Sequence, residues 1–128
     1  MHFGEHLTID GYGGEEKLLD DKNLVLKSLQ ELPGLLGMNI LLPPQLVAST
    51  TCGQKDPGGW TGFVVIAESH ISIHTFPKRG FVSIDVYTCK NDMDTKTIEN
   101  YFKEMFALKE LEVNFIKRGT KYPPTNIY

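Results

Sequence analysis

The sequence lacks the features of membrane, secreted and nucleic-acid-binding proteins. No apolar run approaches the roughly 20 residues that span a bilayer, and the first residues have neither the cationic segment nor the apolar stretch of a signal peptide. The 13 basic residues form no cluster, and the net charge is −3, which makes nucleic acid a poor partner. We therefore expect a cytoplasmic protein that binds neither membrane nor nucleic acid.

Cysteine is also scarce. The chain contains only Cys52 and Cys89, in settings without the spacing of a disulfide framework, and in a reducing compartment both are expected to be free thiols. Two histidines and two cysteines can form a zinc site. However, the spacing of His70, His74 and Cys89, with Cys52 far away, matches no standard pattern. We expect no metal site.

The bulk of the chain is that of a globular protein. With 128 residues, 41% of them apolar and 23% charged, it fits one domain with a real core. It has no repeat, no low-complexity tract and no linker, so we expect a single domain spanning residues 1–128.

The periodicity of apolar residues predicts strands and two helices. Alternation predicts strands at 5–11, at either 38–42 or 46–50, and at 62–67, 71–75, 81–88 and 111–116. Helical spacing predicts one helix at about 21–32, closed by Pro33-Gly34, and a second that contains residues 98–106, with Asp92 or Asp94 as N-cap. The tail from Lys117 is expected to be loosely held.

This order of elements predicts an α/β two-layer sandwich of the α+β class. Its antiparallel sheet would carry both helices on one face. The other face of such a sheet needs a cover, which makes a homodimer a reasonable expectation.

One segment is polar where the rest of the predicted sheet is not. It runs from Glu68 to Pro77, and the strand that follows it places Asp85, Tyr87 and Cys89 on one face. Taken singly, a serine at a strand end is usually a turn former, and a cysteine is more often a small core residue than a nucleophile. The pattern alone therefore indicates only a serine, a histidine and a cysteine that can meet.

The run ESHISIHTFP, followed by GFVSIDVYTC, resembles the bacterial and archaeal S-adenosylmethionine decarboxylases, which are pyruvoyl enzymes made as inactive proenzymes. The resemblance covers the opening Gly4-Glu5-His6-Leu7 with Asp10 and Tyr12, residues 57–89, and the ending Arg118-Gly119. It implies self-cleavage between residues 68 and 69, which would give a β chain of residues 1–68 and an α chain of residues 69–128.

The same resemblance assigns roles to individual residues. Ser69 is the precursor of a covalent pyruvoyl cofactor, and its hydroxyl attacks the carbonyl of Glu68. Thr61, where relatives usually have Ser, hydrogen-bonds the resulting oxyanion. An imidazole ionises near neutral pH, which suits His74 to remove the Cα proton of residue 69. Cys89 is the catalytic acid that returns a proton to the substrate carbon.

Strand geometry separates two of these groups. Five residues of strand place His74 about 16 Å from Ser69, and the odd separation points the two side chains to opposite faces. We therefore expect a homodimer with shared active sites, in which Thr61 and His74 of one subunit serve Ser69 and Cys89 of the other.

The sequence departs from the family where the adenosyl group binds. At the position of Lys78, relatives normally have a Glu whose carboxylate binds the ribose hydroxyls. At the position of Lys55, they normally have a Phe that stacks on adenine. An ammonium accepts no hydrogen bond and offers no stacking surface. Trp60 is an alternative stacking residue. Lys90 replaces the Gly that usually follows the cysteine.

These departures favour a changed amino-acid substrate. The family resemblance extends to pyruvoyl-dependent arginine and ornithine decarboxylases, also of polyamine biosynthesis, and the distal cation of such a substrate needs an acid such as Asp10, Glu5 or Asp56. Two alternatives stay open. One is an S-adenosylmethionine decarboxylase with a rebuilt adenosine site, and the other is an uncleaved, non-catalytic binding or regulatory relative.

Overall fold

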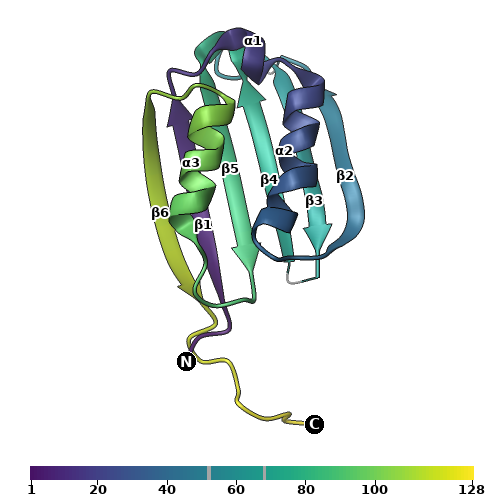
Figure 1. Cartoon of the computed structure of the whole chain (residues 1–128), viewed down its shortest axis with the longest axis vertical. Helices are drawn as coiled ribbons and strands as arrows, with labels where there is room; N and C mark the ends of the chain where they lie inside the picture. The colour runs from purple at the N-terminus through teal and green to yellow at the C-terminus, as the bar shows by residue number, and fades with distance from the viewer. Residues whose placement is uncertain (52, 68) are drawn as a thin grey trace.

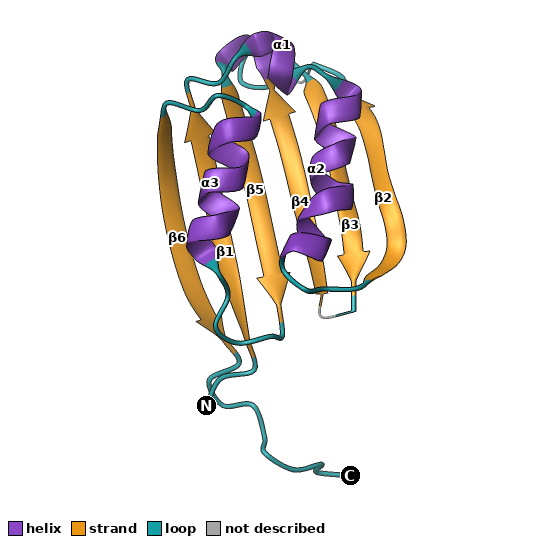
Figure 2. Cartoon of the chain, viewed as in Figure 1, coloured by secondary structure: helices purple, strands orange, loops and turns teal. Residues whose placement is uncertain are grey.

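A computed structural model describes residues 1–51, 53–67 and 69–128. Within these ranges six strands form one sheet, in the order β2-β3-β4-β5-β1-β6, and every neighbouring pair is antiparallel. Two helices cover one face of the sheet, and a third, short helix lies at one end of it (Figures 1 and 2). The strands are β1 Gly4–Tyr12, β2 Ile40–Ser49, β3 Gly59–Ile66, β4 Ser69–Phe76, β5 Phe81–Thr88 and β6 Glu110–Arg118. The predicted two-layer α+β sandwich with an antiparallel sheet is confirmed.

The helices differ from the prediction in number and length. The sequence pattern missed α1, Glu16–Leu19, because one turn contains too few apolar residues to show a period. Helix α2, Lys22–Leu35, continues past Pro33, which was expected to close it. A proline near the last turn removes only one backbone N–H, and the helix ends two residues later. None of the helices in the described ranges is long and apolar enough to cross a membrane.

Helix α3, Thr95–Met105, follows the predicted pattern. Asp94 is its N-cap, and its carboxylate accepts a hydrogen bond from the backbone N–H of Thr97 at 3.2 Å. The apolar face of α3 buries Ile98 and Phe102, and Phe106 is buried just beyond the helix. These side chains complete a core between the helices and the inner face of the sheet, together with residues such as Leu7, Ile9, Leu29, Leu32, Ile71, Ile73 and Ile84.

Phe102 fills the centre of this core, and Phe102→Ala is expected to lower the free energy of unfolding by about 3–5 kcal/mol. The phenyl ring is fully buried and stacks on Phe106, with ring centroids 6.4 Å apart. Urea unfolding followed by circular dichroism measures the loss. Lys103→Ala, at the exposed neighbouring position, is the control and should change stability by less than about 0.5 kcal/mol. An equal loss in both variants would contradict this placement of the core.

Strand β2 joins the two alternatives that the sequence left open. It runs from Ile40 to Ser49 through Pro43 and Pro44, with register shifts against β3 on the way. Because β2 is the first strand of the sheet order, one of its edges has no strand partner. Prolines, which cannot donate to a ladder, are tolerated on such an edge.

The face of the sheet opposite the helices is formed by alternate residues of neighbouring strands, and it is largely polar. Strand registers align five of its side chains in one row across the sheet, namely Thr61, His74, Ser83, Asp10 and Glu112. We refer to this surface as the open face. Ile71, Ile73 and Thr75 of β4 point the other way and are buried.

Candidate active site

Thr61 and His74 lie directly opposite each other on β3 and β4. The hydroxyl of Thr61 and Nδ1 of His74 are 3.3 Å apart, and both side chains are half-buried on the open face. The structure therefore brings together two residues that are thirteen positions apart in the sequence. A hydroxyl beside an imidazole can hydrogen-bond an oxyanion while the ring takes up a proton.

Ser69 is the first residue of β4 and has an unusual backbone. Its φ angle is 155°, in a region that residues with a side chain rarely adopt and that stores strain. Its hydroxyl oxygen lies 3.2 Å from Nδ1 of His70. A strained backbone at a serine whose hydroxyl lies beside an imidazole fits a pyruvoyl group made from this serine. Glu68, the predicted partner in cleavage, lies outside the described residues.

Cys89 lies at the same end of the sheet as Ser69. Ser69 pairs with Thr88, the last residue of β5, and Cys89 follows at once as a half-buried free thiol. His74 lies five residues further along β4, about 16 Å away, with Thr61 opposite it on β3. In Figure 1, β4 begins and β5 ends at the lower end of the sheet, opposite the end that α1 covers. One chain thus holds two half-sites, a Ser69–Cys89 half-site and a Thr61–His74 half-site. Cys52, the other predicted free thiol, lies outside the described residues.

Sequence reasoning gave no catalytic role to a group of polar and aromatic side chains on the open face, one of which, His70, contacts Ser69. The rings of His6 and His70 each lie 5.7 Å from the ring of Tyr87. His6 pairs with Asp85 at 2.9 Å, and the guanidinium of Arg118 lies 4.9 Å from the Tyr87 ring. Strand alternation is the signal that could have found them, since it places these residues on one face with His74.

The three acids proposed for a substrate cation occupy different environments. Asp10 lies on the open face in the row of His74, and burial and the charges of Glu112 and Asp85 raise its pKa. Glu5 lies on the opposite face and is 4% exposed. Burial raises the pKa of Glu5, but hydrogen bonds outweigh burial and the net pKa is below the ordinary value. The carboxylate of Glu5 is thus already hydrogen-bonded within the chain.

Asp56 and Lys55 line a cavity of about 500 Å³ together with Phe76, Arg79 and Phe81. The two phenylalanine rings lie 5.5 Å apart and form an aromatic wall. One carboxylate oxygen of Asp56 accepts from the N–H of Gly58 at 2.9 Å. The guanidinium of Arg79 donates to the carbonyl of Gln54.

Lys78 and Trp60 lie apart from that cavity. Lys78 lines a separate cavity of about 420 Å³, beside Glu16 and Asp20. The indole N–H of Trp60 donates to the carbonyl of Asp20 at 2.9 Å, and the ammonium of Lys22 lies 5.9 Å from its ring. Lys55 and Lys78, the two lysines that the sequence treats as a pair, therefore line different cavities.

Comparison with known proteins agrees with this arrangement over nearly the whole chain. The family model described as S-adenosylmethionine decarboxylase matches residues 5–119. The S-adenosylmethionine decarboxylase proenzyme of Clostridium botulinum is 32% identical over 116 residues, which are 91% of this chain and 94% of that protein. The proenzyme of Acetivibrio thermocellus is 31% identical over 124 residues, which are 97% and 94%.

A solved structure gives the same result in three dimensions. The adenosylmethionine decarboxylase of Aquifex aeolicus superposes with a TM-score of 0.80 at 26% identity and covers 98% of both chains. Members of this family are carboxy-lyases of polyamine synthesis that use a covalent pyruvoyl group formed from a serine by self-cleavage. The resemblance inferred from the Glu-Ser-His-x-x-x-His-Thr core is thus confirmed, and the chain belongs to the S-adenosylmethionine decarboxylase proenzyme family.

Proposed function

We propose that this chain cleaves itself between residues 68 and 69, converts Ser69 into a pyruvoyl group and decarboxylates L-arginine or L-ornithine in a homodimer with shared sites. The observation that carries the proposal is the division of the family's four reactive residues between two half-sites of one chain. The expected cytoplasmic location stays a prediction.

Self-cleavage uses groups that the chain itself supplies. The Ser69 hydroxyl adds to the carbonyl carbon of residue 68, the C–N bond breaks, and an ester and a free amine result. The Thr61 hydroxyl donates to the oxyanion formed on the way. His74 takes the Cα proton of residue 69, and the ester breaks so that the chain 1–68 leaves as a carboxylate. Water then hydrolyses the remaining enamine, releases ammonia and leaves the pyruvoyl group.

A second copy brings the half-sites together. Ser69 and His74 lie about 16 Å apart along β4 and cannot meet within a chain. The φ angle of Ser69 departs from a regular strand, and its hydroxyl lies 3.2 Å from Nδ1 of His70, a residue of the open face. Two open faces packed around a two-fold axis would therefore bring the Thr61–His74 half-site of one copy to the Ser69–Cys89 half-site of the other. The open face also exposes apolar side chains. Val47 lies opposite Thr61 and is 63% exposed, and Phe63, on the same strand as Thr61, is 41% exposed. Burying them against a partner is favourable.

Decarboxylation then needs one more group from the chain. The pyruvoyl group supplies a ketone that condenses with the substrate amine and a carbonyl that accepts electrons as CO₂ leaves. The Cys89 thiol returns a proton to the substrate carbon. Its place next to the partner of Ser69 in the strand register supports this role.

The Asp56 cavity supports a small cationic substrate. A carboxylate beside two aromatic rings suits a guanidinium or ammonium group. The cavity also contains two basic side chains, Lys55 and Arg79, and Arg79 is bonded to a backbone carbonyl. Lys55 and Lys78 stand where an adenosyl group would need an aromatic ring and a carboxylate. The names of the relatives favour a second candidate, S-adenosylmethionine, for which the adenosine must be held in another way.

Purified protein given L-arginine, L-ornithine or S-adenosylmethionine separately is expected to form agmatine or putrescine, read by mass spectrometry. Asp56→Asn is expected to raise KM about tenfold, because a hydrogen bond to a charged group contributes about 1.5–3 kcal/mol. Asp20→Asn, in the Lys78 cavity, is the matched control and should leave KM unchanged. Product from S-adenosylmethionine alone would contradict the proposed substrate, and an uncut, inactive chain would contradict the proposed chemistry.

A further inference from the structure

The backbone on both sides of Cys89 is held by several specific contacts. Regular pairing of β5 with β1 ends at Thr88, so Cys89 begins an irregular segment that leads to α3. The Thr88 hydroxyl accepts a hydrogen bond from the N–H of Lys90 at 3.0 Å. A side chain at Gly4 would come within 2.5 Å of the carbonyl oxygen of Thr88 and 3.1 Å of the Cα of Cys89. Strand β1 is therefore packed directly against the residue that carries the thiol.

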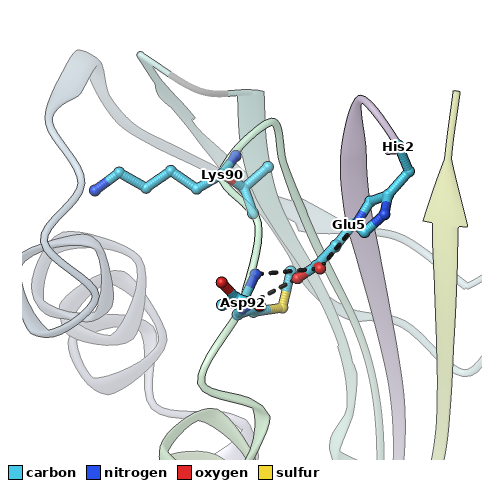
Figure 3. A network of polar contacts seen from close by, with 6 residues as sticks. His2, Glu5, Lys90 and Asp92 are labelled. Atoms are coloured by element: carbon cyan, nitrogen blue, oxygen red, sulfur yellow. Dashed lines mark hydrogen bonds and ion pairs between the residues drawn. The ribbon is translucent and has the colours of Figure 1, made fainter. Parts of the chain in front are cut away.

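Glu5 fixes the segment after the cysteine. Its carboxylate accepts hydrogen bonds from the backbone N–H groups of Met93 at 2.8 Å and Asp92 at 3.2 Å, and it lies 3.0 Å from Nε2 of His2 (Figure 3). A buried carboxylate is costly unless hydrogen bonds compensate for the lost water. The contacts of Glu5 meet this requirement and tie residues 92 and 93 to the start of β1.

Lys90 fixes the segment from the opposite side. Its ammonium donates to the carbonyl of Gly37 at 2.9 Å, in the turn that follows α2. Figure 3 shows the Lys90 side chain extending away from Glu5 and Asp92. A glycine, which relatives usually have at position 90, could not make this contact. The cysteine segment is therefore held between β1 and the end of α2.

We propose that Glu5 and Lys90 are positioning residues, which fix the turn 89–93 so that the Cys89 thiol meets the substrate carbon. This inference rests on the proposed role of Cys89 as proton donor. Neither residue touches the reacting atoms. Glu5 acts from β1 through the backbone N–H groups of residues 92 and 93, and Lys90 acts through its bond to the carbonyl of Gly37, in the turn after α2. Loosening either contact should misplace the thiol without changing how the substrate is bound.

The test uses the variants Glu5→Gln and Lys90→Met. It measures the order of the segment 89–93 separately from the rate of decarboxylation. Amide hydrogen exchange of residues 92 and 93 is expected to accelerate about tenfold or more in Glu5→Gln, because a hydrogen bond to a charged group is lost. Alkylation of Cys89 by iodoacetamide, quantified on its peptide, should accelerate several-fold in both variants. In the cleaved enzyme kcat should fall about tenfold with KM unchanged, and Lys90→Arg should restore most of it.

Matched controls separate positioning from general destabilisation. Glu31→Gln removes a carboxylate that accepts from Tyr101, and Lys96→Met removes a lysine that is 83% exposed. Both should leave alkylation, exchange and kcat unchanged. Unchanged exchange and alkylation in Glu5→Gln and Lys90→Met would overturn the inference, whatever the activity. A second outcome is that these rates rise but Cys89→Ala decarboxylates at full speed. Glu5 and Lys90 then hold the segment as described, but Cys89 is not the proton donor, and the proposal that they position a proton donor is wrong.

Discussion

A mixture of Ser69→Ala chains and His74→Ala chains is expected to regain self-cleavage at one site in each mixed dimer, although each variant alone stays uncut. The reason is geometric. Ser69 and His74 belong to half-sites about 16 Å apart on β4, so each intact site needs Ser69 from one chain and His74 from the other. A mixed dimer contains one site with both groups intact and one site with neither.

The experiment is read by mass spectrometry after the two variants are mixed under conditions of subunit exchange. At equal amounts half of the dimers are mixed, so about a quarter of all chains should be cut, all of them His74→Ala chains, because only these retain Ser69. The control is the double variant Ser69→Ala/His74→Ala mixed with His74→Ala, which should give no cleavage. Exchange without cleavage in the first mixture would contradict shared sites. Cleavage of the unmixed His74→Ala variant would contradict the role of His74.

Cys89→Ala is expected to cut itself normally but to decarboxylate about 10²–10⁴-fold more slowly. Self-cleavage needs the Ser69 hydroxyl, Thr61 and His74, whereas only the later proton return needs the thiol, and a positioned acid contributes about that factor. The two chains are measured by mass spectrometry, and kcat is measured on the amine product.

Cys52→Ala is the matched control for this variant. The family resemblance gives Cys52 no role, so the same chemical change should leave kcat within about twofold. A Cys89→Ala enzyme with undiminished kcat would show that another group returns the proton. A Cys89→Ala chain that stays uncut would place the thiol in self-cleavage instead.

The sequence best predicted the helices and strands in which the apolar residues repeat with a long, uninterrupted period. The bounds of β5 agree residue by residue with the prediction, and the N-cap of α3 is Asp94, one of the two predicted candidates. The single turn of α1 and the passage of β2 through Pro43-Pro44 were not predictable, because a short helix has no period and a proline pair usually marks a break. Such exceptions are decided by tertiary context, here the free edge of β2 and the packing of α1 on the segment at Pro77.

The site was predictable in its chemistry more than in its surroundings. The spacing of Thr61 and His74 in two neighbouring strands gives their contact once the register is known. The sequence could not show that Lys55 and Lys78 line separate cavities, since Lys55 lies in a turn before β3 and Lys78 lies in the 3₁₀ turn Pro77–Arg79. Nor could it show that Glu5 is buried against residues 92 and 93, because this contact spans 88 positions.

The strand order has a consequence for the cleaved protein. A cut between residues 68 and 69 assigns β1, β2 and β3 to one fragment and β4, β5 and β6 to the other, and β1 lies between β5 and β6. The two fragments would therefore be interleaved in one sheet, and separating them would break three ladders of hydrogen bonds, those of β3 with β4 and of β1 with β5 and β6. With the proposed self-cleavage, each protomer would fold as one chain but would release two chains when it unfolds. Denaturation of the cut dimer would therefore depend more steeply on protein concentration than denaturation of the uncut dimer.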